Sequence, residues 1–200
     1  MRITRLFALF VLTAAGLISL AARPPQDAPS AEDMAAMAEM MRLAQPGPEH
    51  AELAKYVGAW TGESSIFMAP GAPSMKQASS ASCRLVLDGR FLQMESAGDF
   101  MGQPFGSMGM FGFDRRNEVW TTVGFDTLGT YWVSGSGPRD DEGVIRMHGR
   151  DDSPTGSQVY YFEIDFISDD EFTSSVFFTE QGPQTYDPPF KMVETRYTRK

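Results

Sequence analysis

The sequence predicts an all-β protein: a closed or nearly closed antiparallel up-and-down barrel of about ten strands, preceded by a short N-terminal helix. From Ala59 onward, aromatic and β-branched residues alternate with polar ones at a period of two. Turn signals such as Asp88-Gly89 recur along the same region, and no stretch within it has helical spacing. A meander of this length can curl and pair its own edges. These observations together predict the closed barrel.

The first element in chain order is an apolar segment, residues 1–22, which we interpret as a secretory signal peptide. Arg2 and Arg5 precede an uncharged run from Leu6 to Leu20, and small residues follow it. That order is typical of a cleaved leader, and the run is short for a bilayer span. An uncleaved N-terminal anchor is the alternative. We therefore expect a periplasmic or secreted bacterial protein, with no stable membrane span after cleavage.

Charge and residue counts exclude several classes of function. Removing Arg2 and Arg5 with the leader changes the net charge from −9 to −11. Such a surface repels nucleic acid, which is not an expected partner. Cys83 is the single cysteine, so the chain cannot form an internal disulfide. The two histidines, His50 and His148, are too few for a three-histidine metal site.

Residues 23–48 are rich in proline, alanine and methionine, and they read as a linker that carries a short helix. Ser30 is the expected N-cap of this helix, and no β-branched residue interrupts it up to Ala44. Met34, Met37 and Met41 fall on one helical face. That stripe favours packing, and the alternative is a Cu(I) site, because thioethers are soft ligands.

The barrel domain is expected over residues 49–200. Its predicted strands are 59–68, 77–87, 90–98, 104–113, 117–126, 129–136, 142–149, 158–167, 171–179 and 190–199. Aromatic residues on both faces of the strand at 158–167 suggest an outer packing surface and a lined interior. The sequence leaves open which face points inward.

The junction between helix and first strand resembles the calycin superfamily of lipocalin-like barrels. It is carried by Gly58, Trp60 and Gly62, which form a Gly-x-Trp-x-Gly motif. The resemblance implies that Trp60 closes one end of the barrel and that an arginine of the last strand packs across it. Arg199, or failing that Arg196, is the expected partner, and a guanidinium over an indole adds a cation–π contact.

A more extensive resemblance is to an uncharacterised bacterial family, the domain of unknown function numbered fifteen seventy-nine. The motifs that carry it are "GPEHAELAKYVGAWTG", "VLDGRFL", "GMFGFD", "FDTLGTY" and "ETRYTRK", in that order between residues 47 and 200. The resemblance implies the barrel fold and supplies no established activity.

Catalytic motifs are absent from the sequence: it contains no Gly-x-Ser-x-Gly, His-Glu-x-x-His, Cys-x-x-Cys or P-loop pattern. The candidates for contact with a ligand in a cavity are Arg90, Tyr131, His148, Tyr161, Met108 and Met110. Arg90 is a possible anchor for an anionic group. No cofactor is expected. Haem held by His148 is an alternative, because nitrobindin-like barrels, which are calycin relatives, bind haem through one histidine.

The leading hypothesis is an exported binding protein that holds a small, mainly hydrophobic molecule inside the barrel. The alternative is an enzyme, a hydrolase or isomerase that uses arginine, tyrosine and carboxylate groups in the same cavity. A third hypothesis is an interaction protein, in which the barrel is a scaffold for the N-terminal helix. The oligomeric state stays open.

Overall fold

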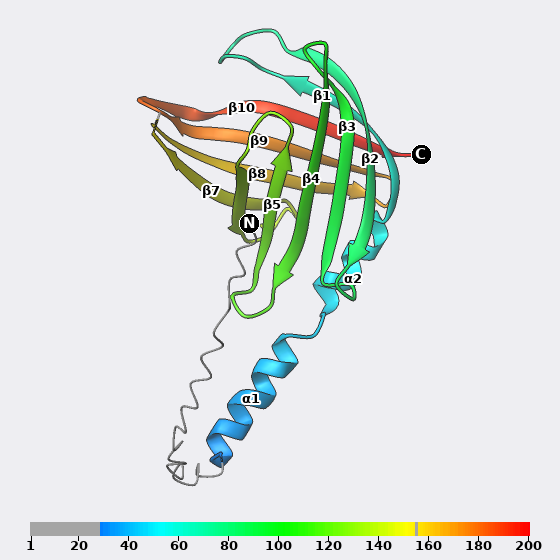
Figure 1. The fold of residues 1–200 in the computed structure, drawn as a ribbon, viewed down its shortest axis with the longest axis vertical. Helices are drawn as coiled ribbons and strands as arrows, with labels where there is room; N and C mark the ends of the chain where they lie inside the picture. The colour runs from blue at the N-terminus through cyan, green and yellow to red at the C-terminus, as the bar shows by residue number, and fades with distance from the viewer. Residues whose placement is uncertain (1–28, 155) are drawn as a thin grey trace, which may run out of the picture. The chain divides into compact units, whose positions relative to one another are not determined.

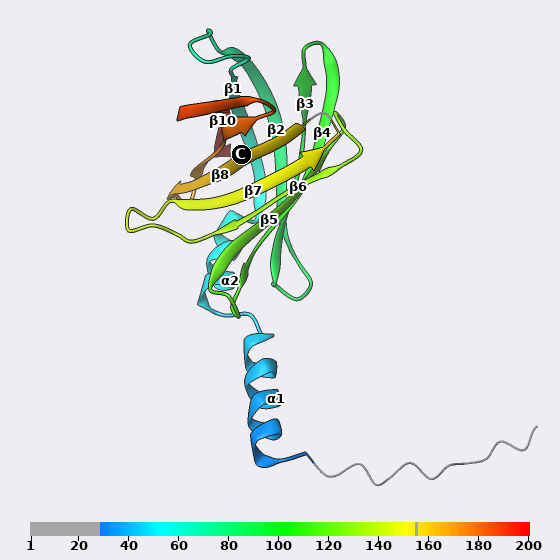
Figure 2. The same cartoon turned by 90° about the vertical axis from the view of Figure 1, so that its left-hand side faces the viewer.

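The computed structural model describes residues 29–154 and 156–200, and in it ten strands form one closed antiparallel barrel (Figure 1). Each strand pairs with the next in the chain, and β1 pairs with β10 to close the barrel. Figures 1 and 2 show β2–β4 running steeply on one side, while β7 and β8 cross that direction on the other. The predicted fold class is confirmed.

The strands are β1 Gly58–Ile66, β2 Met75–Val86, β3 Phe91–Phe100, β4 Gln103–Asp114, β5 Val119–Asp126, β6 Trp132–Gly137, β7 Ile145–Ser153, β8 Gly156–Ser168, β9 Glu171–Gln181 and β10 Gln184–Arg199. The largest difference from prediction is the start of β10. The strand predicted from residue 190 begins at Gln184, and Pro188 and Pro189 lie in an irregularity where the pairing with β9 skips from Thr185 to Phe190. A proline that cannot donate to the ladder is tolerated at such a bulge.

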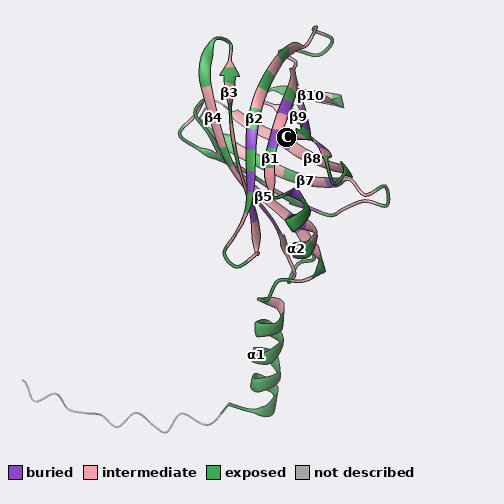
Figure 3. Cartoon of the chain, turned by 90° about the vertical axis from the view of Figure 1, so that its right-hand side faces the viewer, coloured by how far each residue is buried: buried purple, intermediate pink, exposed green. Residues whose placement is uncertain are grey.

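The predicted N-terminal helix is α1, Ala31–Leu43. Ser30 caps it: the backbone N–H of Asp33 donates to Ser30 Oγ at 3.1 Å, and the N–H of Ser30 donates to Asp33 Oδ2 at 3.0 Å. No residue of α1 is buried, and Figure 3 shows it exposed except at its C-terminal end. The boundary between the two units of the chain falls between Met37 and Ala38. The predicted signal peptide lies outside the described residues.

Two short helical elements, α2 (Pro48–Leu53) and η1 (Ala54–Tyr56), cover the end of the barrel at which β1 begins. Leu53 is fully buried, and the ring of Tyr56 stacks on Phe166 with centroids 3.9 Å apart. This closed end holds the hydrophobic core, which comprises Leu53, Tyr56, Trp60, Ala81, Cys83, Leu92, Phe111, Trp120, Ile145, Met147, Phe172 and Tyr197. The opposite end, formed by the β1–β2, β3–β4 and β5–β6 connections, is called the open end below.

Candidate functional site

Trp60 establishes which face of each strand points into the barrel, because its side chain is fully buried. Side chains alternate across a strand, so Gly58, Gly62 and Ser64 share the inward face of β1. The pairing register carries this phase around the barrel: Trp60 pairs with Ala81 of β2. Ala81 in turn pairs with Ser96 of β3 and Ser96 with Ser107 of β4.

Arg199 of β10 stabilises the closed end. In the strand register it pairs with Trp60 of β1. Its guanidinium carbon lies 4.4 Å from the centroid of the Trp60 ring, which is the contact that the sequence predicted for it. The same guanidinium donates hydrogen bonds to the carbonyl oxygens of Val57 at 3.0 Å and Lys55 at 2.6 Å, and to that of Asp169. Arg199 therefore ties η1 and the β8–β9 turn to the tryptophan.

Arg196, the second arginine considered for this contact, lies on the outer face. The strand alternation places it opposite in direction to Tyr197, and its guanidinium is paired with Glu171 at 2.6 Å. The indole N–H of Trp60 donates to the carbonyl oxygen of Tyr56 at 3.0 Å, so the polar atom of this buried ring is satisfied.

The two positions beside Trp60 require glycine for different structural reasons. Gly58 has a φ of +138°, and a Cβ there would lie 3.0 Å from a guanidinium nitrogen of Arg199. A Cβ at Gly62 would overlap Ser79 Oγ and lie 3.0 Å from the ring of Tyr197. Gly62 thus leaves room for side chains of two neighbouring strands to meet over β1.

Those side chains belong to a group of inward hydroxyls on β10, β1, β2 and β3, which we call the hydroxyl belt: Thr195, Tyr197, Ser64, Ser79 and Ser96. Ser64 Oγ and Thr195 Oγ1 are 2.8 Å apart. The Tyr197 hydroxyl is hydrogen-bonded to both Ser96 and Thr195. Because a hydroxyl both donates and accepts, the belt can turn either function toward a ligand.

The interior disfavours charge. Burial raises the pKa of the Tyr197 hydroxyl above its ordinary value, with the hydrogen bonds to Ser96 and Thr195 opposing the rise. Burial also raises the pKa of the inward Cys83 thiol to about 11, only slightly offset by Arg199. Both groups are therefore neutral at physiological pH, and Cys83 is a buried structural thiol rather than a reactive one.

Two adjacent inward glycines, Gly109 of β4 and Gly124 of β5, leave space along the inner wall. A Cβ at Gly109 would meet only the backbone oxygen of Val123, at 3.7 Å, and one at Gly124 only Val133, at 3.5 Å. These are ordinary contact distances, so a Cβ at either position would fit without displacing a neighbour. Met94 pairs with Gly109 and Val133 with Gly124, which makes this part of the wall apolar.

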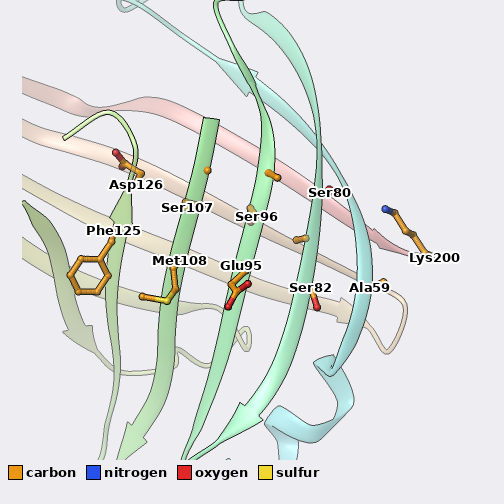
Figure 4. A pocket seen from close by; sticks show the side chains of 13 residues that line it. Ala59, Ser80, Ser82, Glu95, Ser96, Ser107, Met108, Phe125, Asp126 and Lys200 are labelled. Atoms are coloured by element: carbon orange, nitrogen blue, oxygen red, sulfur yellow. The ribbon is translucent and has the colours of Figure 1, made fainter. Parts of the chain in front are cut away.

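A separate groove of about 750 Å³ crosses the outer face of β1–β5 (Figure 4). Its lining side chains come mainly from the outward register, where Ser82, Glu95, Met108 and Phe125 pair in one row from β2 to β5. Figure 4 shows the side chains of Glu95, Met108 and Phe125 along this face.

Four residues predicted to line an internal cavity lie on the outer face instead. His148 and Tyr161 pair across β7 and β8, next to the fully buried Met147, and their rings are 5.5 Å apart. Met108 and Met110 alternate with the inward Gly109. The sequence could not reveal this because both faces of these strands carry large apolar residues. A role for these side chains in ligand binding stays a prediction, and any such role would be outside the barrel.

The remaining two candidates lie at opposite ends. Tyr131 is 60% exposed just before β6, at the open end. Arg90 follows the β2–β3 turn at the closed end, where its guanidinium donates to the carbonyl oxygen of Leu87 at 3.2 Å and faces Asp88 at 3.8 Å. These local contacts give Arg90 a structural environment distant from the open end.

His50 supports the closed end from α2. The backbone N–H of Gly47 donates to His50 Nδ1 at 3.1 Å, and the other ring nitrogen donates to the backbone carbonyl of Phe113. Burial lowers the pKa of His50, and this effect outweighs the opposing influence of Glu49. The neutral imidazole is thus the form that fits these contacts.

The residues offered for metals and cofactors are dispersed. Within residues 29–154 and 156–200, no three His, Cys, Asp or Glu side chains are grouped to hold a metal ion. Met34, Met37 and Met41 are 57%, 56% and 60% exposed on α1, and copper binding by them stays a prediction. Because His148 points outward, iron bound to it would lie outside the barrel. Among the described helices, none is long and apolar enough to cross a bilayer.

The hydroxyl belt was missed by the sequence-based reasoning, although a signal for it exists. Counting in twos from Trp60 through the β1–β2 pairing leads to Ser79, Ala81 and Cys83 on the inward face. The pattern of small residues in "SSASC" and "MESAG" marks where an inner wall carries hydroxyls rather than bulk. The pairing register is required to see that they face Tyr197.

Comparison with known proteins identifies a family and a fold. The family described as "Protein of unknown function (DUF1579)" matches residues 45–199. The crystal structure of Rv2717c from M. tuberculosis superposes with a TM-score of 0.54 and 17% sequence identity, covering 78% of this chain and 99% of that one. At that identity the likeness establishes the barrel fold alone. No curated protein matches the sequence.

Proposed function

Because the chain belongs to the DUF1579 family of proteins of unknown function, we propose its function from the inner wall: it is an exported protein that holds one small, mainly hydrophobic molecule inside the barrel. Export is inferred from the leader-like pattern of residues 1–22.

The observation that carries the proposal is the room that the inner wall leaves at Gly109 and Gly124, where an added Cβ would make only ordinary contacts. Close-packed interiors leave few voids larger than a water molecule, so an inner wall that omits side chains at two paired positions favours a ligand there. Met94 and Val133 supply apolar contact, and the aromatic plug around Trp60 forms a rigid floor. Pockets for small molecules commonly combine such apolar walls with a few placed polar groups.

The inner wall does not favour the enzyme hypothesis. Among the described residues, Arg90 lies at the closed end, and Tyr161 lies on the outer face. Glu163, a carboxylate of β8, forms an ion pair with Arg146 at 2.6 Å. These groups converge on no common point inside the barrel.

Native mass spectrometry of the purified protein, followed by denaturing extraction, tests for a co-purified molecule. Binding of the neutral dye N-phenyl-1-naphthylamine, measured by fluorescence, gives a second assay. Gly109→Leu should fill the inner space and weaken dye binding roughly tenfold or more. Gly106→Leu is the matched control. Gly106 lies on the outer face of the same strand and lines the groove, and a Cβ there would make only ordinary contacts, the nearest with Thr127 at 3.7 Å.

The two variants separate the two locations. Loss of dye binding in Gly109→Leu alone supports an internal site. Loss in Gly106→Leu alone would place the dye in the outer groove and contradict the proposal, as would the absence of both a co-purified molecule and saturable dye binding. Circular dichroism of both variants checks that the barrel remains folded.

A further inference from the structure

The charges on the inner wall are confined to its two ends. Among the described residues, two cations face inward at the closed end. Arg199 lies against Trp60, with its nitrogens already bonded to backbone carbonyls. Arg139 bridges to the inward Ile145, lies over the Trp120 ring at 4.9 Å and is paired with Glu52 at 2.7 Å. At the open end, Asp126 of β5 pairs with the inward Ser107, and Asp151 of β7 is in phase with the inward Gly149. Within residues 29–154 and 156–200, both inward cations are thus already paired with protein groups at the closed end.

Between these ends the inward polar side chains of the described strands are uncharged. They are the hydroxyls of the belt, the hydroxyls of Ser107, Thr122, Tyr160 and Ser174, and the amides of Gln77 and Gln158. Ser64, Thr195, Tyr197 and Ser96 form a connected chain of hydrogen bonds across β1, β10 and β3. Reorientation of one hydroxyl lets the chain donate to a carbonyl or accept from an alcohol without any change of charge.

A carboxylate would be poorly accommodated in this setting. Burying an anion without a paired cation is costly, and the two carboxylates at the open end would repel it on entry. An alcohol, ketone or amide avoids both penalties and gains hydrogen bonds that the hydroxyls can supply.

From this arrangement we infer that the ligand class is an uncharged amphiphile, whose alcohol or carbonyl group contacts the hydroxyl belt and whose hydrocarbon part lies along Gly109 and Gly124. The inference rests on the proposed function and names its ligand chemistry. It excludes fatty acids as the preferred class, although an apolar barrel interior alone would admit them.

Competition against N-phenyl-1-naphthylamine tests the inference with three twelve-carbon probes: 1-dodecanol, dodecanoate and dodecane. At pH 8, we expect dodecanol to displace the dye at a concentration at least about tenfold lower than dodecanoate does. Ser96→Ala removes one hydroxyl of the belt and should weaken dodecanol several-fold while leaving displacement by dodecane unchanged. Ser80→Ala, on the outer face of β2, is the control and should alter neither.

The outcomes are distinguishable. Equal or tighter binding of dodecanoate would overturn the inference and leave the binding function standing. Loss of dodecane and dodecanol binding together in Ser96→Ala would show that the serine acts only on the fold, which also overturns it. Absence of saturable dye binding by the unmodified protein would overturn the proposed function and the inference with it.

Discussion

Replacing Arg199 with methionine should destabilise the barrel by about 3 kcal/mol. The change removes hydrogen bonds to the carbonyl oxygens of Val57, Lys55 and Asp169, and the cation–π contact with Trp60. A hydrogen bond to a charged group contributes about 1.5–3 kcal/mol, and the cation–π contact about 0.5–2 kcal/mol. The sum is reduced because the Arg199 side chain is 29% exposed, so that water replaces part of the lost bonding.

Urea unfolding followed by tryptophan fluorescence measures this loss, and a thermal melt should show a decrease of about 6–12 °C for a domain of this size. Arg196→Met is the matched control: it removes the same charge three residues earlier, where the arginine pairs with Glu171 on the outer face. Its effect should be much smaller. If the two variants were equally destabilised, the reasoning that Arg199 locks the closed end would be wrong.

Three further predictions concern buried groups. Gly62→Ala should destabilise by about 1–3 kcal/mol through overlap with Ser79, whereas Gly106→Ala on the outer face should be nearly neutral, as urea unfolding will show. The lowered pKa of His50 means that the unfolded state binds more protons near pH 6. Stability should therefore decline as pH falls from 7 through the unfolded pKa of about 6.5, and His50→Asn should flatten that part of the profile. A slope unchanged in the variant would contradict it. Cys83, 2% exposed and with a pKa of about 11, should resist iodoacetamide at pH 8 until urea unfolds the protein, and rapid alkylation of the folded protein would refute this.

The sequence predicts the barrel well because its main signals are local. Alternation and turn residues define strands, and Gly58, Trp60 and Gly62 define how the first strand enters the closed end. The cap at Ser30 likewise depends on residues three apart. Such interactions leave a direct pattern in the chain.

The candidate site was less predictable, because it depends on which face of each strand points into the barrel. His148 and Tyr161 look like cavity residues in the sequence, yet one fully buried neighbour, Met147, turns both outward. A shift of a single position exchanges the two faces of a strand. The meeting of Tyr197 with Ser96 adds a second difficulty, since it joins residues about a hundred positions apart through the pairing of β10 with β1.

The pairing of β1 with β10 also determines when, during synthesis, the barrel can close. Of the ten barrel strands, β1 is synthesised first and its partner β10 last, so the barrel cannot close until β10 has been made. Until Arg199 has been synthesised, no guanidinium packs on Trp60, and the strands at the two edges of the sheet are unpaired. Unpaired edge strands favour association with other chains. A chain delivered N-terminus first, whether from the ribosome or across a membrane, thus completes its barrel in one late step. A chain that stops at Thr198 would lack Arg199 in that step.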